Sequence, residues 1–354
     1  MTTTLRDIPV TQWLEGLARE TGLFRVLHVE HLRGEHDLRV VLQSDADRQV
    51  TLYVEARSRV TPKLALGMFP GLVKVPLGGY PMLCTYSVSP RVAELCRQNN
   101  VAYLDEAGNC WIRTPGLCVH VTGRPSTRPD TRPAVDPFAP LSSRIARVLL
   151  GDPTKAWRLS DLANEAKVSV GLAWKVKKAL LEEGYIQLPD KRIVLRDAAG
   201  LLNAWKKKYD VPAEKVPLYA IGKTNELESR LFECCTARQV RCAMTGLSGA
   251  WRSAPMVRYT TVSAYVDVSA APGATSELVQ CMEAKPVDTG ANLVLHPTRD
   301  ESVFFGMRTL AGMGVVSPIQ LYLDLLQVAG RGEDAANEIM AKELSPLFEQ
   351  SKPD

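Results

Sequence analysis

Residues 157–196 of this chain read WRLSDLANEAKVSVGLAWKVKKALLEEGYIQLPDKRIVLR. In the second half of this stretch, Ser169 precedes a run whose apolar residues recur at helical spacing, namely Leu172, Val176, Ala179 and Leu180. A serine in this position can accept a hydrogen bond from a backbone amide of the first helical turn. The other face of the run carries glycine, tryptophan and lysine. The sequence therefore predicts a capped amphipathic helix with one basic face.

A charged turn between two short apolar runs follows this helix. Gly184 suits the end of the helix because glycine adopts positive φ easily, and residues 185–188 and 193–195 have the composition of strands. Upstream, residues 143–150 and 160–166 predict two more helices, the second capped by Ser160. Three helices and a hairpin in this order predict a winged helix-turn-helix, whose usual partner is double-stranded DNA. A wing that contacts another protein is the alternative.

Charge supports the DNA hypothesis. Residues 140–210 hold fourteen Lys and Arg against eight Asp and Glu, a net charge of +6, whereas the whole chain carries +4 and the remainder is therefore near −2. A local excess of this kind is typical of a phosphate-binding surface. The predicted DNA contacts lie on the helix and on the turn, and they are Ser169, Gly171, Trp174, Lys175, Lys177, Lys178, Lys191 and Arg192.

Length and composition predict a multidomain α/β and α+β protein. The 354 residues are 45% hydrophobic and 23% charged, which is ordinary for a globular chain. A proline-rich linker at 125–139 separates a first domain at 1–124 from the winged helix at 140–209, and a third domain follows at 213–354. No signal peptide and no membrane span is expected, so we predict a cytoplasmic location. The eight cysteines lack zinc spacing, and we expect reduced, mostly buried thiols.

The first domain carries a candidate metal site. Helices are predicted at 11–20 and 89–98, with strands at 37–43, 50–56, 81–86, 101–104 and 110–113. Asp37 begins one strand while Glu55 and Arg57 end the next, which resembles the D...(D/E)-x-K arrangement of restriction-endonuclease-like nucleases. There, two carboxylates hold Mg²⁺ and a lysine acts on the attacking water. Because arginine stays protonated, Arg57 is a poor base, and we expect a vestigial site without catalysis or metal.

The third domain is predicted to mix strands at 257–268, 291–295 and 302–307 with helices at 318–326 and 333–344. Its apparent nucleotide motifs are incomplete. Pro217 stands where a P-loop needs its first glycine. A nucleotidyltransferase-like Gly246–Gly249 stretch is followed by Asp267, but Ser269 stands where the second carboxylate is needed. Neither motif predicts nucleotide chemistry.

Four motifs together resemble one protein family. VAYLDEAGN at 101–109, LLNAW at 201–205, VSPIQLYLDLLQ at 316–327 and GRGEDAAN at 330–337 are similar to AbiEi-type antitoxins of type IV toxin-antitoxin systems. The likeness is greater to the long form that has a restriction-endonuclease-like N-terminal domain. It extends from about residue 37 to about residue 344. In this family the winged helix generally comes first, whereas here it is central.

The resemblance implies a repressor that binds its own promoter and counters a nucleotidyltransferase toxin. We therefore predict a sequence-specific DNA-binding regulator of the antitoxin type, without catalysis of its own. The alternatives are a Mg²⁺-dependent nuclease delivered to DNA by its winged helix and a protein-interaction module. A homodimer would suit paired DNA half-sites, although no heptad pattern marks an interface.

Overall fold

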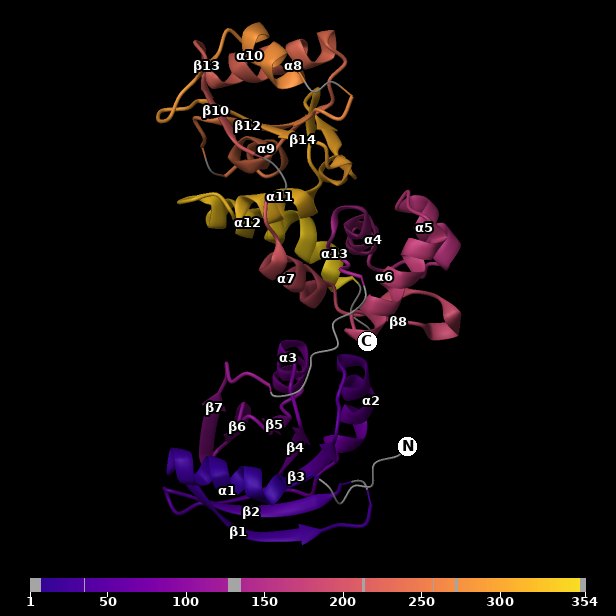
Figure 1. Ribbon diagram of the computed structural model, residues 1–354, viewed down its shortest axis with the longest axis vertical. Coiled ribbons are helices and arrows are strands. Elements are labelled where there is room, and N and C mark those ends of the chain that lie inside the picture. The colour runs from indigo at the N-terminus through magenta and orange to yellow at the C-terminus, as the bar shows by residue number, and fades with distance from the viewer. Residues whose placement is uncertain are drawn as a thin grey trace. The chain divides into compact units, whose positions relative to one another are not determined.

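The computed structural model describes residues 8–34, 36–126, 135–211, 214–256, 258–270 and 273–350. The chain divides into two compact units (Figure 1). Unit 1 holds residues 1–133 with 181–184, and unit 2 holds residues 134–180 and 185–354. Each unit is described by itself below. Most of the predicted linker, residues 127–134, and the first residue of the predicted third domain, 213, lie outside the described residues.

Unit 1 is built on a mixed sheet of seven strands that lie in sequence order. The strands are β1 (Phe24–His31), β2 (Leu38–Ser44), β3 (Gln49–Arg57), β4 (Gly79–Thr85), β5 (Ala102–Asp105), β6 (Cys110–Thr114) and β7 (Leu117–Val121). Strands β3, β4 and β5 are parallel, and the remaining neighbours pair antiparallel. The parallel strands therefore end at one common edge.

Helices cover both faces of this sheet. They are α1 (Val10–Thr21), α2 (Pro62–Leu72) and α3 (Pro90–Gln98). Successive residues of β4 show the alternation, because Met82 packs in the cluster that includes α1 while Leu83 packs in the cluster that includes α2 and α3. This is the period-two burial of a strand covered on both sides. Unit 1 is thus a three-layer α/β arrangement.

Local sequence fixes several boundaries in unit 1. The Ser89 hydroxyl accepts the amide hydrogen bond of Val92 at 3.2 Å, and Pro90 follows as the first residue of α3. The Asp105 carboxylate at the end of β5 accepts from the Asn109 amide at 2.8 Å and from its side chain at 3.0 Å, across a turn with Gly108 at φ +84°. The end of the run at 101–109 thus has a structural explanation, because side chains close the turn.

Three elements of unit 1 were not predicted. Strand β1 leaves most of its side chains partly or fully exposed, so its sequence lacks the apolar alternation of a half-buried strand. Helix α2 contains Pro70 as well as Pro62, and interior proline argues against a helix in sequence. Strand β7 is short and pairs only with β6. These elements depend on neighbours that are distant in sequence.

The helix–hairpin segment, defined here as residues 140–209, belongs to unit 2 except for residues 181–184. Its elements are α4 (Pro140–Gly151), α5 (Leu159–Glu165), α6 (Val170–Glu182), β8 (Ile186–Gln187), the 3₁₀ turn η1 (Pro189–Lys191), β9 (Val194–Leu195) and α7 (Ala198–Lys208). The order of three helices followed by a hairpin agrees with the sequence pattern. One local expectation was wrong: Ser160 lies inside α5, with its hydroxyl 3.0 Å from the Asp161 carboxylate, and Arg158 precedes the helix without a side-chain cap.

The sheet segment, residues 214–350, completes unit 2. Its seven-stranded mixed sheet has the order β13-β10-β14-β12-β11-β16-β15. The strands are β10 (Val216–Tyr219), β11 (Cys242–Met244), β12 (Val262–Asp267), β13 (Lys285–Pro286), β14 (Leu293–Thr298), β15 (Arg308–Leu310) and β16 (Met313–Val315). Helices α8 (Thr224–Ala237) and α10 (Ala274–Cys281) cover one face, while α9 (Gly246–Ser253), α11 (Pro318–Leu325) and α12 (Gly332–Ile339) lie on the other (Figure 1).

Two predictions for the sheet segment were wrong. Residues 302–307 do not form a strand, because residues Glu301–Phe304 form the 3₁₀ turn η2 and the Asp300 carboxylate accepts the Ser302 amide hydrogen bond at 2.9 Å. The last helix does not end at 344: a π-helical turn, η3 (Met340–Leu344), and a further helix, α13 (Ser345–Glu349), follow α12. The predicted strand at 257–268 is confirmed only as β12, and residue 257 lies outside the described residues.

The expectation that all cysteines are reduced was also wrong. Cys234 of α8 and Cys281 of α10 form a disulfide that joins the two helices covering one face of the sheet. Of the six remaining thiols, all are buried except Cys118. Residue spacing could not reveal the pair, because 47 positions separate the two cysteines and only the packing of α8 beside α10 brings them together.

A buried polar network joins the helix–hairpin segment to the sheet segment. The Asp324 carboxylate on α11 is 5% exposed and accepts four hydrogen bonds. Its donors are Thr245 at 2.5 Å, Gln320 at 2.8 Å, Tyr265 at 3.0 Å and Tyr209, which follows α7. Burial raises the pKa of Asp324, while these hydrogen bonds oppose that rise. The network closes only when residues from both segments are in place.

Arg147 of α4 extends the network. Its guanidinium donates to the Gln320 side-chain oxygen at 2.5 Å and lies 4.7 Å from the centre of the Trp205 ring of α7. Burial lowers the pKa of Arg147, and an arginine stacked on an aromatic ring tolerates such a site better than a lysine would. Gln320 therefore stands between a buried cation and a buried carboxylate.

We predict that Asp324→Asn destabilises the protein by about 2–4 kcal/mol, because the new amide nitrogen would face hydroxyl donors and leave a buried hydrogen bond unmade. Urea unfolding of the full chain measures this. The matched control is Asp288→Asn, a change of the same kind at an exposed residue, for which we expect a change within about 0.5 kcal/mol. Equal stabilities for the two variants would contradict the role given to Asp324.

Candidate nucleic-acid interface

Helix α6 presents the basic face that the sequence predicts. The Ser169 hydroxyl accepts the Leu172 amide hydrogen bond at 3.2 Å, which fixes the start of the helix. The residues that α6 buries are Ala173, Val176, Ala179 and Leu180. Among the predicted contact residues of α6, Lys177 is half-buried. Four are exposed, namely Gly171, Trp174, Lys175 and Lys178. The buried stripe thus turns one tryptophan and two lysines outward together.

Trp174 is the aromatic centre of this face. It is 49% exposed although it is one of the larger apolar side chains of the chain. The Lys178 ammonium lies 5.8 Å from the centre of its ring, one helical turn away. The exposed ring therefore shares one helical face with Lys175 and Lys178. It suits a partner that offers both negative charge and flat apolar surface.

The hairpin after α6 supplies the second predicted group. Strands β8 and β9 pair antiparallel through Ile186 with Leu195 and Gln187 with Val194. Between them Asp190 and Lys191 both have positive φ, which makes the turn tight and displays exposed residues at its tip. Lys191 is exposed and Arg192 is half-buried. The structure therefore places Lys191 at the tip of the hairpin and Arg192 just behind it.

A backbone bridge missed in the sequence holds the hairpin against the helices. Trp157 and Ile193 exchange two backbone hydrogen bonds of 2.8 Å, and the buried Trp157 ring lies 3.8 Å from the Lys155 ammonium. Lys155 and Arg158 flank this bridge and are exposed. They add two cations beside the hairpin. Their only sequence signal was their charge, since the bridge pairs residues 36 positions apart.

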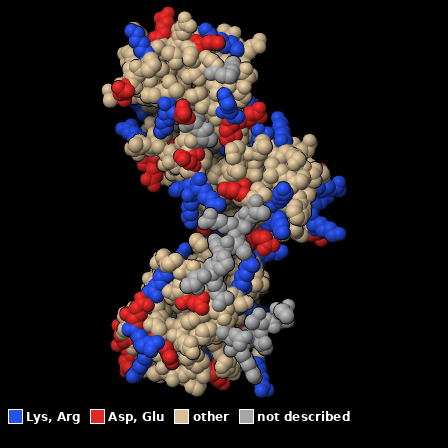
Figure 2. All heavy atoms as spheres, in the orientation of Figure 1, with Lys and Arg blue, Asp and Glu red and all other residues tan. Residues whose placement is uncertain are grey.

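The basic surface is smaller than the sequence count suggests. Of the fourteen cationic residues at 140–210, Arg144 and Arg147 are buried, so neither belongs to the exposed basic surface. Lys206, Lys207 and Lys208 are exposed in the last turn of α7, and Lys208 lies 3.7 Å from the Asp136 carboxylate. In the space-filling view, Lys and Arg side chains gather over the α5, α6 and β8 region (Figure 2).

The predicted residues of unit 1 do come together. Arg57 bridges both carboxylates: its Nη1 lies 3.1 Å from an Asp37 oxygen, and its Nη2 contacts Glu55. The same Asp37 oxygen accepts the Ala56 amide hydrogen bond at 2.8 Å. Burial and the Asp37 charge raise the pKa of Glu55, while Arg57 lowers it. The guanidinium thus lies where two carboxylates would otherwise share a divalent ion.

These residues do not fit a metal site. A bound Mg²⁺ needs free carboxylate oxygens and avoids a neighbouring fixed cation, but Arg57 occupies both acids. Within the described part of the chain, no group of three His, Cys, Asp or Glu side chains is arranged to hold a metal. We derive no metal-dependent step from this cluster.

We predict that millimolar Mg²⁺ leaves the melting temperature of the parent protein unchanged but raises that of Arg57→Ala, since removal of the guanidinium frees two carboxylates for a cation. Stabilisation would rise with the concentration of free Mg²⁺, to about 1.4 kcal/mol at a tenfold excess over the dissociation constant. Differential scanning calorimetry with and without EDTA measures this. The double variant Asp37→Asn, Arg57→Ala is the control and should not respond. A response of the parent protein to Mg²⁺ would contradict the bridging role of Arg57.

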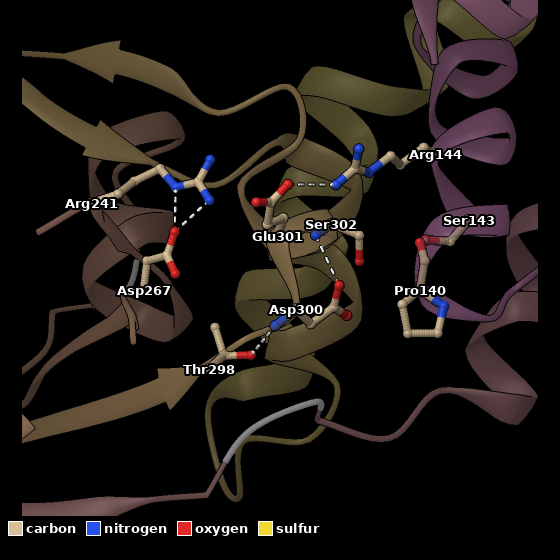
Figure 3. Close-up of polar contacts among 9 residues, drawn as sticks. All are labelled: Pro140, Ser143, Arg144, Arg241, Asp267, Thr298, Asp300, Glu301 and Ser302. Carbon is tan, nitrogen blue, oxygen red and sulfur yellow. Dashed lines mark hydrogen bonds and ion pairs between the residues drawn. The ribbon is translucent and has the colours of Figure 1, made fainter. Parts of the chain in front are cut away.

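A second polar cluster lies at one edge of the sheet in unit 2 (Figure 3). Asp267 ends β12 and accepts from Arg241 at 3.1 Å, and Thr298, paired with Asp267 in register, ends β14. The predicted nucleotidyltransferase-like glycines, by contrast, begin α9, which packs on Ser263 near the start of β12. The glycines and Asp267 therefore stand at opposite ends of β12.

Comparison with known proteins finds a family model that matches part of the chain. Residues 192–345 match the model of a family described as "Transcriptional regulator, AbiEi antitoxin, Type IV TA system". The match covers fewer than half of the 354 residues; it includes β9, α7 and almost all of the sheet segment but not α4–α6. No curated protein and no solved structure matches the chain. Among the described residues, no helix combines the length and the apolar character needed to cross a membrane.

Proposed function

We propose that this protein is a sequence-specific transcriptional regulator that binds double-stranded DNA through residues 140–209, folded as a winged helix-turn-helix. The observation that carries the proposal is the exposed face of α6, where Trp174, Lys175 and Lys178 project together from a capped helix. A helix of this kind enters the major groove, where its side chains reach base edges. Ser169 and Gly171 lie at its N-terminus, where backbone amides attract phosphate.

The hairpin supports the same assignment. Lys191 lies in the tight turn between β8 and β9, and Arg192 directly follows it. The Trp157–Ile193 bridge holds the hairpin to the helices. We propose that these two residues, with Lys155 and Arg158, contact the DNA backbone. Lys177 is half-buried and contributes charge at the margin of the interface. Phosphate contacts of this kind set position and affinity, while the α6 face sets the preferred sequence.

We further propose that the protein is an antitoxin of the AbiEi type, which represses its own promoter and counters a nucleotidyltransferase toxin. The match of residues 192–345 to a family of that description supports this role. In this assignment residues 1–124 are a restriction-endonuclease-like domain without cleavage, and residues 213–354 contact the toxin. The Arg57 bridge across Asp37 and Glu55 favours loss of nuclease chemistry.

For DNA binding we predict that Lys175→Ala with Lys178→Ala weakens affinity for every duplex and lowers the slope of log affinity against log salt by about two units, one for each lost phosphate contact. Fluorescence anisotropy across a salt series measures the slope. The control is Lys285→Ala with Lys342→Ala, which removes two exposed lysines from the sheet segment and should leave the slope unchanged. If the two double variants behave alike, α6 is not the DNA-binding surface.

For the antitoxin role we predict that a nucleotidyltransferase gene lies beside the gene of this protein, and that co-expression of the full chain restores the growth of cells that express that nucleotidyltransferase. The Lys175→Ala, Lys178→Ala variant should restore growth equally, because the sheet segment that contacts the toxin is intact. Growth curves at matched protein levels measure this. Failure of the parent chain to restore growth would exclude the antitoxin role and leave the DNA assignment standing. If the parent chain restored growth but the Lys175→Ala, Lys178→Ala variant did not, the sheet segment would not be sufficient to neutralise the toxin.

A further inference from the structure

Unit 2 contains a cavity of about 330 Å³ at the meeting of its helix–hairpin and sheet segments. It lies between α4, the end of α5 with its following turn, the start of β11, and η2. Its lining residues are Arg144, Glu165, Lys167, Arg241, Glu301, Phe304, Phe305 and Gly306. Figure 3 shows Arg144 and Arg241 approaching this region from opposite sides. The volume is that of a site for a small molecule.

Arg144 is the first sign that the cavity is a binding site. The residue is 8% exposed, yet among the described residues its one hydrogen bond is to Glu301 at 3.2 Å, and its buried Nε has no acceptor. A guanidinium carries five N–H donors, and leaving buried donors unmet is unfavourable. An anion in the cavity would supply the missing acceptors.

Two more cations line the same space. Arg241 uses Nε and Nη2 on the Asp267 carboxylate, which leaves its Nη1 available, and its guanidinium lies 4.4 Å from the centre of the Phe304 ring. Lys167 is exposed in the turn before α6, where its φ is +53°, and within the described ranges its ammonium has no ion-pair partner. The three cations come from three separate elements. Packing within one element therefore does not account for their convergence.

The acidic lining residues do not cancel this charge. Among the lining residues three cations face Glu165 and Glu301, a net of +1, while Asp267, outside the lining, pairs with Arg241. The Glu301 side chain is 57% exposed, so its ion pair with Arg144 is weak and can open at little cost. Phe304 and Phe305 form an apolar wall beside the cations. The site therefore combines positively charged hydrogen-bond donors for an anion with an aromatic surface for a small organic group.

We propose that this cavity binds a small phosphate monoester, with its phosphate held by Arg144, Arg241 and Lys167 and its organic part against Phe304 and Phe305. A phosphate dianion offers several acceptors and matches the planar donor groups of two arginines. Binding displaces Glu301 from Arg144 toward solvent. The proposal concerns a site outside the α6 face and does not depend on DNA binding.

Isothermal titration calorimetry of the full chain without DNA tests the proposal, with AMP, inorganic phosphate and adenosine as probes at constant ionic strength. AMP should bind with one site per chain, phosphate more weakly, and adenosine not at all. Lys167→Gln should weaken AMP binding by about threefold to tenfold, because one charged contact is lost. Glu301→Gln should tighten it by a similar factor, because the competing carboxylate is gone. Lys285→Gln is the control, because Lys285 is exposed and does not line the cavity. It should leave the affinity for AMP unchanged.

The opposite signs of the two variants make the test robust to misfolding, since a damaged fold cannot tighten binding. Unchanged AMP affinity in both variants would overturn the proposal, as would the absence of binding to the folded parent. Binding of phosphate with equal or higher affinity than AMP would overturn the monoester assignment. Binding of adenosine would show that the rings, not the cations, hold the ligand, and would overturn it as well.

Discussion

The buried carboxylate of Asp324 is the constraint on which the organisation of unit 2 depends. A carboxylate removed from water is tolerated only where donors replace its hydration. Here the donors come from β12, from the residue that follows β11, from α11 itself and from Tyr209 at the end of the helix–hairpin segment. Burial raises the pKa of both tyrosines, so they remain protonated donors. The helix–hairpin segment and the sheet segment are consequently coupled parts of one unit.

This coupling shapes how much of the chain could be predicted. The capped helices α3, α6 and α11 were visible in sequence, because a serine, a proline or a glycine at a helix end acts locally. The turn at 105–109 is likewise closed by side chains that are close in sequence. By contrast, the partners of Asp324 are spread over more than a hundred positions, and no local pattern joins them. The error at residues 302–307 has a related cause: η2 begins because the Asp300 side chain caps it, which apolar patterning cannot indicate.

In the candidate sites, too, the sequence identified residues but not how their side chains are arranged. Sequence identified Asp37, Glu55 and Arg57 from their spacing, and the structure brings all three together. Only the structure shows that the Arg57 guanidinium contacts both carboxylates at once and balances part of their negative charge. Charge counting found the basic face of α6 but included Arg144 and Arg147, which are buried. Net charge cannot separate cations that face a partner from cations that hold the protein together.

The spacing of those two arginines on α4 has a structural meaning. Residues three positions apart lie on neighbouring points of one helical face, and here one guanidinium reaches the cavity while the other is locked between Trp205 and Gln320. Helix α4 therefore links the lining of the cavity to the buried network through two side chains of one face.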